Sequence, residues 1–102
     1  MSPHLEVGTI SAQPPGREGV GTASSVILPA NNDRVGLIIV NISDGTIYLG
    51  INNTATLRAG IVLVAGGRGV WSMDDYTYTK DAIAAIGHSA SLEISYQEFV
   101  RG

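Results

Sequence analysis

The sequence predicts an all-β protein, an antiparallel jelly-roll-like β-sandwich of about eight short strands with an extended N-terminal arm. Two observations support this fold class. From Ser25 onward, apolar runs of about four to eight residues return roughly every ten residues and are divided by turn signals. The 102 residues include 13 glycines and 4 prolines, and only 15% are charged, which favours many turns and a sheet surface partly covered by partners. The length suits one domain.

We divide the chain into an N-terminal strand and flexible arm, residues 1–24, and a sandwich body, residues 25–102. The first strand is expected at about residues 5–10. Residues 11–25 contain Pro-Pro-Gly at 14–16, a polyproline-like piece followed by a turn. They therefore predict a long loop or arm that joins the first strand to the body.

The body begins with SSVIL and then VGLIIVNI, which is apolar on both faces and predicts a central buried strand. TIYLGIN, residues 46–52, alternates, so Ile47 and its i+2 neighbours are expected to face the core and Tyr48 and its i+2 neighbours to face outward. The runs ATLRAG, IVLVAGG, GVWSM, YTYT, AIAAIG and SLEISYQEF are interpreted as further strands. In KDAIAAIG the alanines favour helix, but so short a segment is a poor isolated helix, and we predict strand.

Asp44-Gly45 lies between two apolar runs and predicts a hairpin with a type I′ turn, which needs positive φ at both central residues. Asn52-Asn53 and the Asn-Asn-Asp triplet at 31–33 are expected to be further corners. Asn41, Asp44 and Asn52 could be ligands, but their positions are more typical of turns.

The net charge is −3, with Lys80 as the single lysine and five scattered arginines. Binding to nucleic-acid phosphates needs clustered positive charge, so no nucleic-acid partner is expected. No run approaches the roughly 18 apolar residues of a membrane span, and the first residues lack the basic and apolar regions of a secretory signal. Cysteine is absent, which excludes disulfides, thiolate catalysis and cysteine-bound zinc.

Gly-His-Ser-Ala-Ser at 87–91 approaches the nucleophile-elbow pattern G-x-S-x-G. Ser91 stands where that pattern needs glycine, and a strand rather than a helix is expected to follow. We therefore expect Ser89 to lie in a polar turn, although a hydrolase centred on Ser89 is a third functional hypothesis.

No other motif predicts a catalytic, cofactor or metal site. Asp74-Asp75 lacks the spaced oxygen ligands of a calcium loop. Ala-Gly-Gly-Arg-Gly at 65–69 lacks the Lys-Ser or Lys-Thr and the helix of a phosphate loop. His4 and His88 belong to no metal-ligand spacing.

Trp71, Tyr76 and Tyr78 lie close together in the sequence. An exposed cluster of such rings can stack on sugars or contact a partner. Alternatively, the rings close one end of the core while their hydroxyl groups reach water. Both readings stay open at this point.

From Ser25 to the end, the order of motifs is LPAN, Arg34 before a strand closing in VNISD, TIYLGIN, LRAGIVLVAGG, VWSM, AIAAIG and SLEISYQEF. In this order the chain resembles a family of small tailed-bacteriophage virion proteins, the β-sandwich proteins of capsid decoration and head fibres. It departs from the family where Asp81-Ala82 replace a glycine before the alanine-rich run. Residues 1–24 have no clear counterpart.

The resemblance implies a non-enzymatic virion structural protein without a cofactor, most simply a capsid decoration (cement) protein that binds the major capsid protein, or another virion protein, and stabilises the head. Such a protein is made in the host cytoplasm and ends on the capsid surface. A homo-oligomer is expected, with a trimer favoured, and an extended arm can add a strand to a neighbour. The alternative is a carbohydrate- or receptor-binding module of a head fibre or tail that uses Trp71, Tyr76 and Tyr78.

Overall fold

The computed structural model describes residues 10–74 and 78–101, which form nine β-strands and no helix. Five strands form the first sheet: β1 (Ile10–Ala12), β2 (Gly16–Val20), β4 (Arg34–Asn41), β7 (Gly69–Ser72) and β9 (Leu92–Arg101). Four strands form the second sheet: β3 (Ser25–Leu28), β5 (Ile47–Ile51), β6 (Ile61–Leu63) and β8 (Ile83–Gly87).

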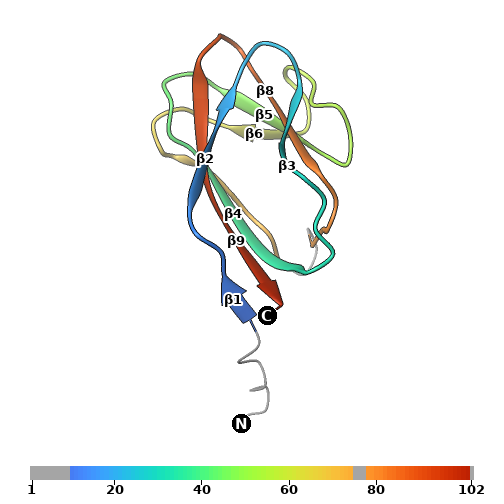
Figure 1. Cartoon of the computed structure of the whole chain (residues 1–102). Helices are drawn as coiled ribbons and strands as arrows, with labels where there is room; N and C mark the ends of the chain where they lie inside the picture. Colours follow the sequence, from blue (N-terminus) through green and yellow to red (C-terminus); the bar gives the residue numbers. More distant parts are fainter. Residues whose placement is uncertain (1–9, 75–77, 102) are drawn as a thin grey trace.

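The two sheets pack as the layers of a β-sandwich, with β9 running along the first layer (Figure 1). The first sheet has the order β2–β9–β4–β7, and β1 pairs with the C-terminal part of β9. The second sheet has the order β3–β8–β5–β6, and every pairing is antiparallel. The strands from β2 to β9 are thus arranged as in a jelly roll. The predicted all-β sandwich is confirmed.

The core fills the space between the sheets with inward side chains at every second strand position. Ile39 and Ile94 of the first sheet and Ile47 of the second are 0% exposed. The buried cluster consists of apolar residues from the eight strands β2 to β9 and comprises Val20, Ile27, Leu28, Leu37, Ile39, Ile47, Leu49, Leu63, Trp71, Ile83, Ala85, Leu92 and Ile94.

The alternation predicted for residues 46–52 is confirmed for Ile47 and Leu49, which face the core. Tyr48 has the outward position but is only 6% exposed. Val62 and Ile86 flank it on the neighbouring strands, and the His88 ring lies 5.5 Å from its ring centroid. Side chains on the outer face therefore cover Tyr48.

The predicted strand at the alanine-rich run is confirmed as β8, which lies between β3 and β5. Two long-range ladders supply the hydrogen bonds that the short segment could not supply as a helix.

Residues 11–25 differ from the expected loop, because part of this segment is built into the first sheet. Gly16–Val20 forms β2 along β9, and Val20 is 2% exposed in the core. Glycines at 16, 19 and 21 made this segment resemble a loop, yet pairing with β9 needs only backbone groups. Of the strand expected at residues 5–10, only Ile10 lies within the described residues.

The predicted type I′ hairpin at Asp44-Gly45 is wrong. β4 belongs to the first sheet and β5 to the second, so the connection crosses between layers. Neither Asp44 nor Gly45 has a positive φ. An Asp-Gly pair between apolar runs does not by itself distinguish a hairpin from such a crossing.

The apolar run at 55–60 is a turn instead of a strand. The amide of Ala59 donates to the carbonyl of Thr56, and Arg58 has a φ of 63°. The run YTYT forms no strand in its described part, Tyr78 and Thr79, and Tyr76 lies outside the described residues.

Candidate functional site

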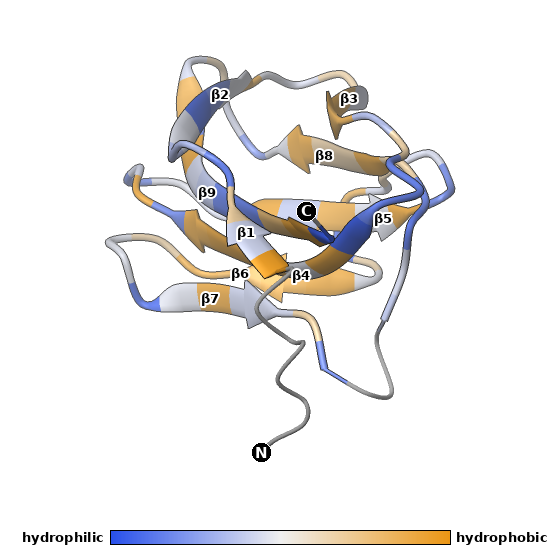
Figure 2. Cartoon of the chain, turned by 60° about the horizontal axis from the view of Figure 1, so that its bottom comes forward, coloured by the Kyte–Doolittle hydropathy of each residue, from blue (hydrophilic) through white to orange (hydrophobic). Residues whose placement is uncertain are grey.

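The outward side of the first sheet carries the candidate site, which we call the β7–β4–β9 face. It is formed by the outward side chains of these strands and of the residue after β4, namely Ile38, Val40, Ile42, Val70, Ser72, Glu93, Ser95, Gln97 and Phe99. Hydrophobic segments mark β4 and β7 in Figure 2. No further layer covers this side in the part of the chain that the structure describes.

Apolar residues on this face are exposed to solvent. Ile38 is 41% exposed, Ile42 42% and Val70 55%. The sequence predicts that VGLIIVNI is buried on both faces, and this is correct only for the inward residues such as Leu37 and Ile39. A strand in the middle of a sheet is buried on both sides only if a second layer covers each side.

The strand registers place the outward residues in rows across the face. Val40 lies opposite Val70 on one side and Ser95 on the other. Ile38 lies in the same way between Ser72 and Gln97. Each row therefore carries an apolar residue at its centre on β4.

A shallow hollow of about 210 Å³ lies on the β4–β9 part of this face. It is lined by Pro15, Ile38, Val40, Ser95, Tyr96 and Gln97. Pro15 precedes β2, so the segment expected to be a loop contributes to its rim. Apolar and uncharged polar groups line the hollow, which suits a protein side chain.

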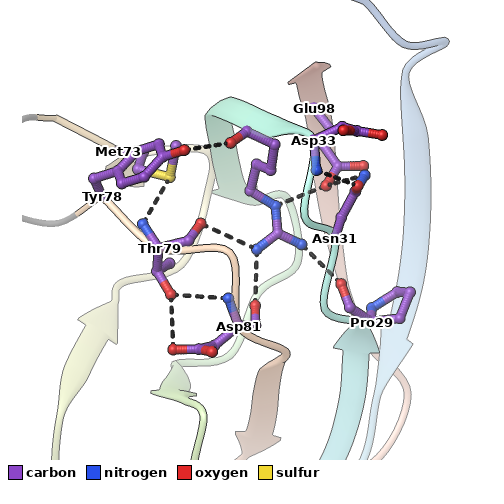
Figure 3. Close-up of polar contacts among 9 residues, drawn as sticks. Pro29, Asn31, Asp33, Met73, Tyr78, Thr79, Asp81 and Glu98 are labelled. Atoms are coloured by element: carbon purple, nitrogen blue, oxygen red, sulfur yellow. Dashed lines mark hydrogen bonds and ion pairs between the residues drawn. The ribbon is translucent and has the colours of Figure 1, made fainter. Parts of the chain in front are cut away.

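A buried polar cluster supports the sheet behind one end of this face (Figure 3). Arg34 is 0% exposed, and its Nε donates to Oε2 of Glu98 over 2.7 Å. Its Nη1 donates to the carbonyl of Asp81 and its Nη2 to the carbonyl of Pro29, both over 2.8 Å. The carbonyl of Arg34 accepts a hydrogen bond from the hydroxyl group of Tyr78. The cluster ties the segments before β4 and β8 to β9.

Sequence reasoning missed this cluster. It treated Arg34 as one of several scattered arginines, and no motif marks Glu98. A bulge between Arg34 and Gly36 reverses the alternation at the start of β4, so the side chain of Arg34 turns inward.

The three candidate contact residues do not form one exposed cluster in the described structure. Trp71 points inward from β7 and is 9% exposed within the core. Tyr78 is 46% exposed, and Nζ of Lys80 lies 5.9 Å from its ring centroid. Tyr76 lies outside the described residues. Their contact role stays a prediction.

The corner residues Asn41 and Asn52 stabilise turns. Asn41 is 0% exposed, and its Nδ2 donates to the carbonyls of Gly45 and Leu63 over 2.8 Å each. Its Oδ1 accepts bonds from the amide and hydroxyl groups of Ser43. Asn52 has a φ of 56°, as expected for a corner. Both Nδ2 and Oδ1 of Asn41 are therefore engaged within the protein, whereas binding of a ligand by Asn41 would need one of these atoms.

The other motifs lie on exposed connections. Ser89 is exposed between β8 and β9, so a strand follows it as predicted, and His88 beside it is exposed. Residues 65–68 of the glycine-rich motif form the turn before β7, and Gly69 begins that strand. Asp74 is exposed after β7. His4 and Asp75 lie outside the described residues. In residues 10–74 and 78–101 no three acidic or histidine side chains gather as a metal site.

Two grooves lie beside the loop that follows β5 in the second sheet. The larger, about 390 Å³, is lined by Ser24, Ser25, Val26, Asn52, Asn53, Thr54, Ala82 and Ala84. The other, about 350 Å³, runs along Gly50 and Gly60 on the far side of this loop. The lining of both is uncharged, so they suit neutral ligands.

Among the described residues no helix has the length and apolarity to cross a membrane.

No protein-family model matches the sequence, and no curated protein matches it. A solved structure does match the fold: a chain from Bacillus endospore appendages, described as a novel family of disulfide-linked pili. The TM-score is 0.56 at 14% sequence identity, and the alignment covers 91% of this chain and 88% of that chain. At this identity the similarity shows a shared fold. The resemblance to phage virion proteins stays a prediction.

Proposed function

We propose that this chain is a non-enzymatic structural subunit that packs in many copies into an assembly on the surface of a particle or cell. The observation that carries the proposal is the β7–β4–β9 face, where Ile38, Ile42 and Val70 are each more than two-fifths exposed. Contiguous exposed apolar residues on a sheet face are typical of protein–protein contacts.

The shared fold with an appendage protein supports the general class of function. That protein is described as disulfide-linked, whereas the 102 residues here contain no cysteine. Copies of this chain would therefore associate by noncovalent contacts. Weak contacts are sufficient where many copies act together, because avidity multiplies their effect.

Two settings fit this class. The sequence resemblance favours a capsid decoration protein that binds the major capsid protein on a phage head. The fold similarity favours a subunit of an extracellular appendage. In either setting, β1 pairs with the end of β9 at Arg101, and this edge of the first sheet can exchange a strand with a neighbour.

Immunogold electron microscopy tests the proposal. Antibodies against the purified protein would be applied to producing cells and to particles from their culture medium. We expect regular labelling of phage heads or of surface filaments, and which of the two is labelled identifies the setting. Label confined to the cell interior, with particles and filaments bare, would overturn the proposal.

A second candidate function is glycan binding. The half-exposed ring of Tyr78 and the groove lined by Asn52, Asn53 and Thr54 favour it. Hydroxyl and amide side chains can bond sugar hydroxyls, and an aromatic face can stack on a sugar ring. Titration of the ¹⁵N-labelled protein with a panel of neutral saccharides would locate such a site by shifted amide signals. Unchanged spectra across the panel would remove this candidate.

A further inference from the structure

We infer that the β7–β4–β9 face binds the same face of a second copy of this chain, with the two copies related by a twofold axis parallel to β4. The inference deepens the proposed function and rests on it for its biological setting. The pairing itself follows from the arrangement of side chains on the face.

Three rows of the face, those of Ile38, Val40 and Ile42, carry a large apolar side chain on β4, and the Ile42 row lies at one end. At the other end Phe99 lies opposite Gly36. The amide of Ile42 donates to the carbonyl of Glu93 and so continues the ladder between β4 and β9. Asn41 pairs with Gly69, and its carbonyl accepts from the amide of Gly67, so Arg68, the exposed turn residue between these two glycines, lies at this end of the face on the β7 side. Arg68 and Glu93 thus lie on opposite sides of β4.

Three columns follow from these rows. The central column on β4 is apolar throughout and contains Ile38, Val40 and Ile42. One flanking column contains Ser72 and Val70 of β7 and ends at Arg68 in the preceding turn. The other, on β9, contains Gln97, Ser95 and Glu93.

Rotation about a twofold axis that lies above β4 and parallel to it leaves the position of each row along the strand unchanged. It exchanges the two flanking columns. The β7 column of one copy then lies on the β9 column of the other. Arg68 meets Glu93, an ion pair made twice, and Ser72 meets Gln97, a donor and acceptor pair made twice. The three apolar residues of β4 meet their own copies at the axis.

The shape of the face agrees with this arrangement. Val70 is the most exposed apolar residue of the face, at 55%. The hollow of about 210 Å³ includes Ser95, which lies in the same row on the other side of β4. The axis therefore brings Val70 of each copy to the hollow of the other. A self-complementary surface of this kind is what an isologous contact requires.

The size of the face predicts a weak contact. Strands are about 4.8 Å apart and rise about 3.4 Å per residue, so three rows on three strands cover roughly 300 Å² of each copy. A stable dimer usually buries about 800 Å² per partner. We therefore expect weak, reversible association of the isolated pair, which suits a contact repeated within an assembly.

Charge reversal tests the pairing. Sedimentation velocity of the wild type up to about 1 mM should show reversible dimers. Arg68→Glu and Glu93→Arg should each weaken self-association at least several-fold, because each places like charges together. A 1:1 mixture of the two variants should dimerise at least as well as the wild type, since both of its ion pairs are then restored.

The control is Arg58→Glu, a reversal of the same sign on an exposed turn of the loop after β5. It should associate like the wild type. Far-ultraviolet circular dichroism should show all variants folded, because the three substituted side chains are not buried. Wild type that stays monomeric to 1 mM, a trimer mass, or a mixture no stronger than its components would overturn the inference.

The outcome of this test is independent of the outcome of the immunogold test. If particles are labelled but the mixture does not dimerise, the structural role stands and another surface makes the contact. If the mixture dimerises while label stays inside the cell, the pairing stands and the surface assembly does not.

Discussion

Nε of Arg34 lies 2.7 Å from Oε2 of Glu98, and the two side chains are 0% and 14% exposed. The residues come from neighbouring strands of the first sheet and are 64 positions apart in the sequence. A buried guanidinium is tolerated only if its hydrogen-bonding groups are satisfied. Here the carbonyls of Pro29, Thr79 and Asp81 complete the set.

We expect Arg34→Met to destabilise the fold by about 3–5 kcal/mol. The substitution keeps much of the side-chain volume but removes the charged donor to the Glu98 carboxylate and the donor to the carbonyls of Pro29, Thr79 and Asp81. Urea unfolding followed by circular dichroism measures the change. Arg17→Met is the matched control, because Arg17 and Glu93 are 4.0 Å apart and 70% and 44% exposed, and a loss below about 0.5 kcal/mol is expected there. Equal losses for both variants would contradict a structural role for the buried pair.

Asn41→Ala should cost about 2–4 kcal/mol, because it leaves the carbonyls of Gly45 and Leu63 without donors at a buried corner. Asn53→Ala is the control. Asn53 is exposed and makes one local bond, to the carbonyl of Ile51, so its loss should be about 0.5 kcal/mol or less. The same urea titrations compare the two. An Asn41 variant as stable as the Asn53 variant would show that the crossing between the sheets does not depend on this side chain.

Gly69→Ala should destabilise by about 2–3 kcal/mol through overpacking. A Cβ at this position would overlap the backbone N and O atoms of Val64 and lie 2.6 Å from the carbonyl carbon of Leu63. Backbone atoms cannot move aside as a flexible side chain can. Gly21→Ala is the control, since a Cβ there meets nothing within 4 Å. Thermal unfolding should show a midpoint lowered by roughly 10–20 °C for the first variant and nearly unchanged for the second, and similar midpoints would contradict this prediction.

The periodicity of apolar residues predicted a strand well where the two faces of the strand differ in polarity, or where turn residues bound the strand. β5, β8 and β9 follow the expected pattern because their long-range partners reinforce it. Alternation continued from Ile38 would place Arg34 outward, whereas the bulge turns its side chain inward. A bulge depends on the partner strand, which local sequence does not reveal.

The candidate site was hidden for a related reason. The apolar run that contains Ile38 and Val40 predicts burial on both faces, and whether a second layer covers the outer face depends on the path of the whole chain. The role of Asn41 was foreseen as a corner, but the crossing between sheets at Asp44-Gly45 was not. The same dipeptide suits both connections, and only the pairing partners of β4 and β5 distinguish them.

Trp71 provides a direct check on the orientation of β7, which determines what the β7–β4–β9 face presents. It is the single tryptophan of the chain and points inward, whereas Val70 points outward. We expect its emission to be blue-shifted and weakly quenched by acrylamide in the folded protein, and strongly quenched in urea. The double variant Val70→Trp, Trp71→Phe moves the indole to the outer face, where red-shifted emission and strong quenching are expected. If the wild-type indole were quenched as strongly in the folded protein as in urea, β7 would face the other way and Val70 would be lost from the face.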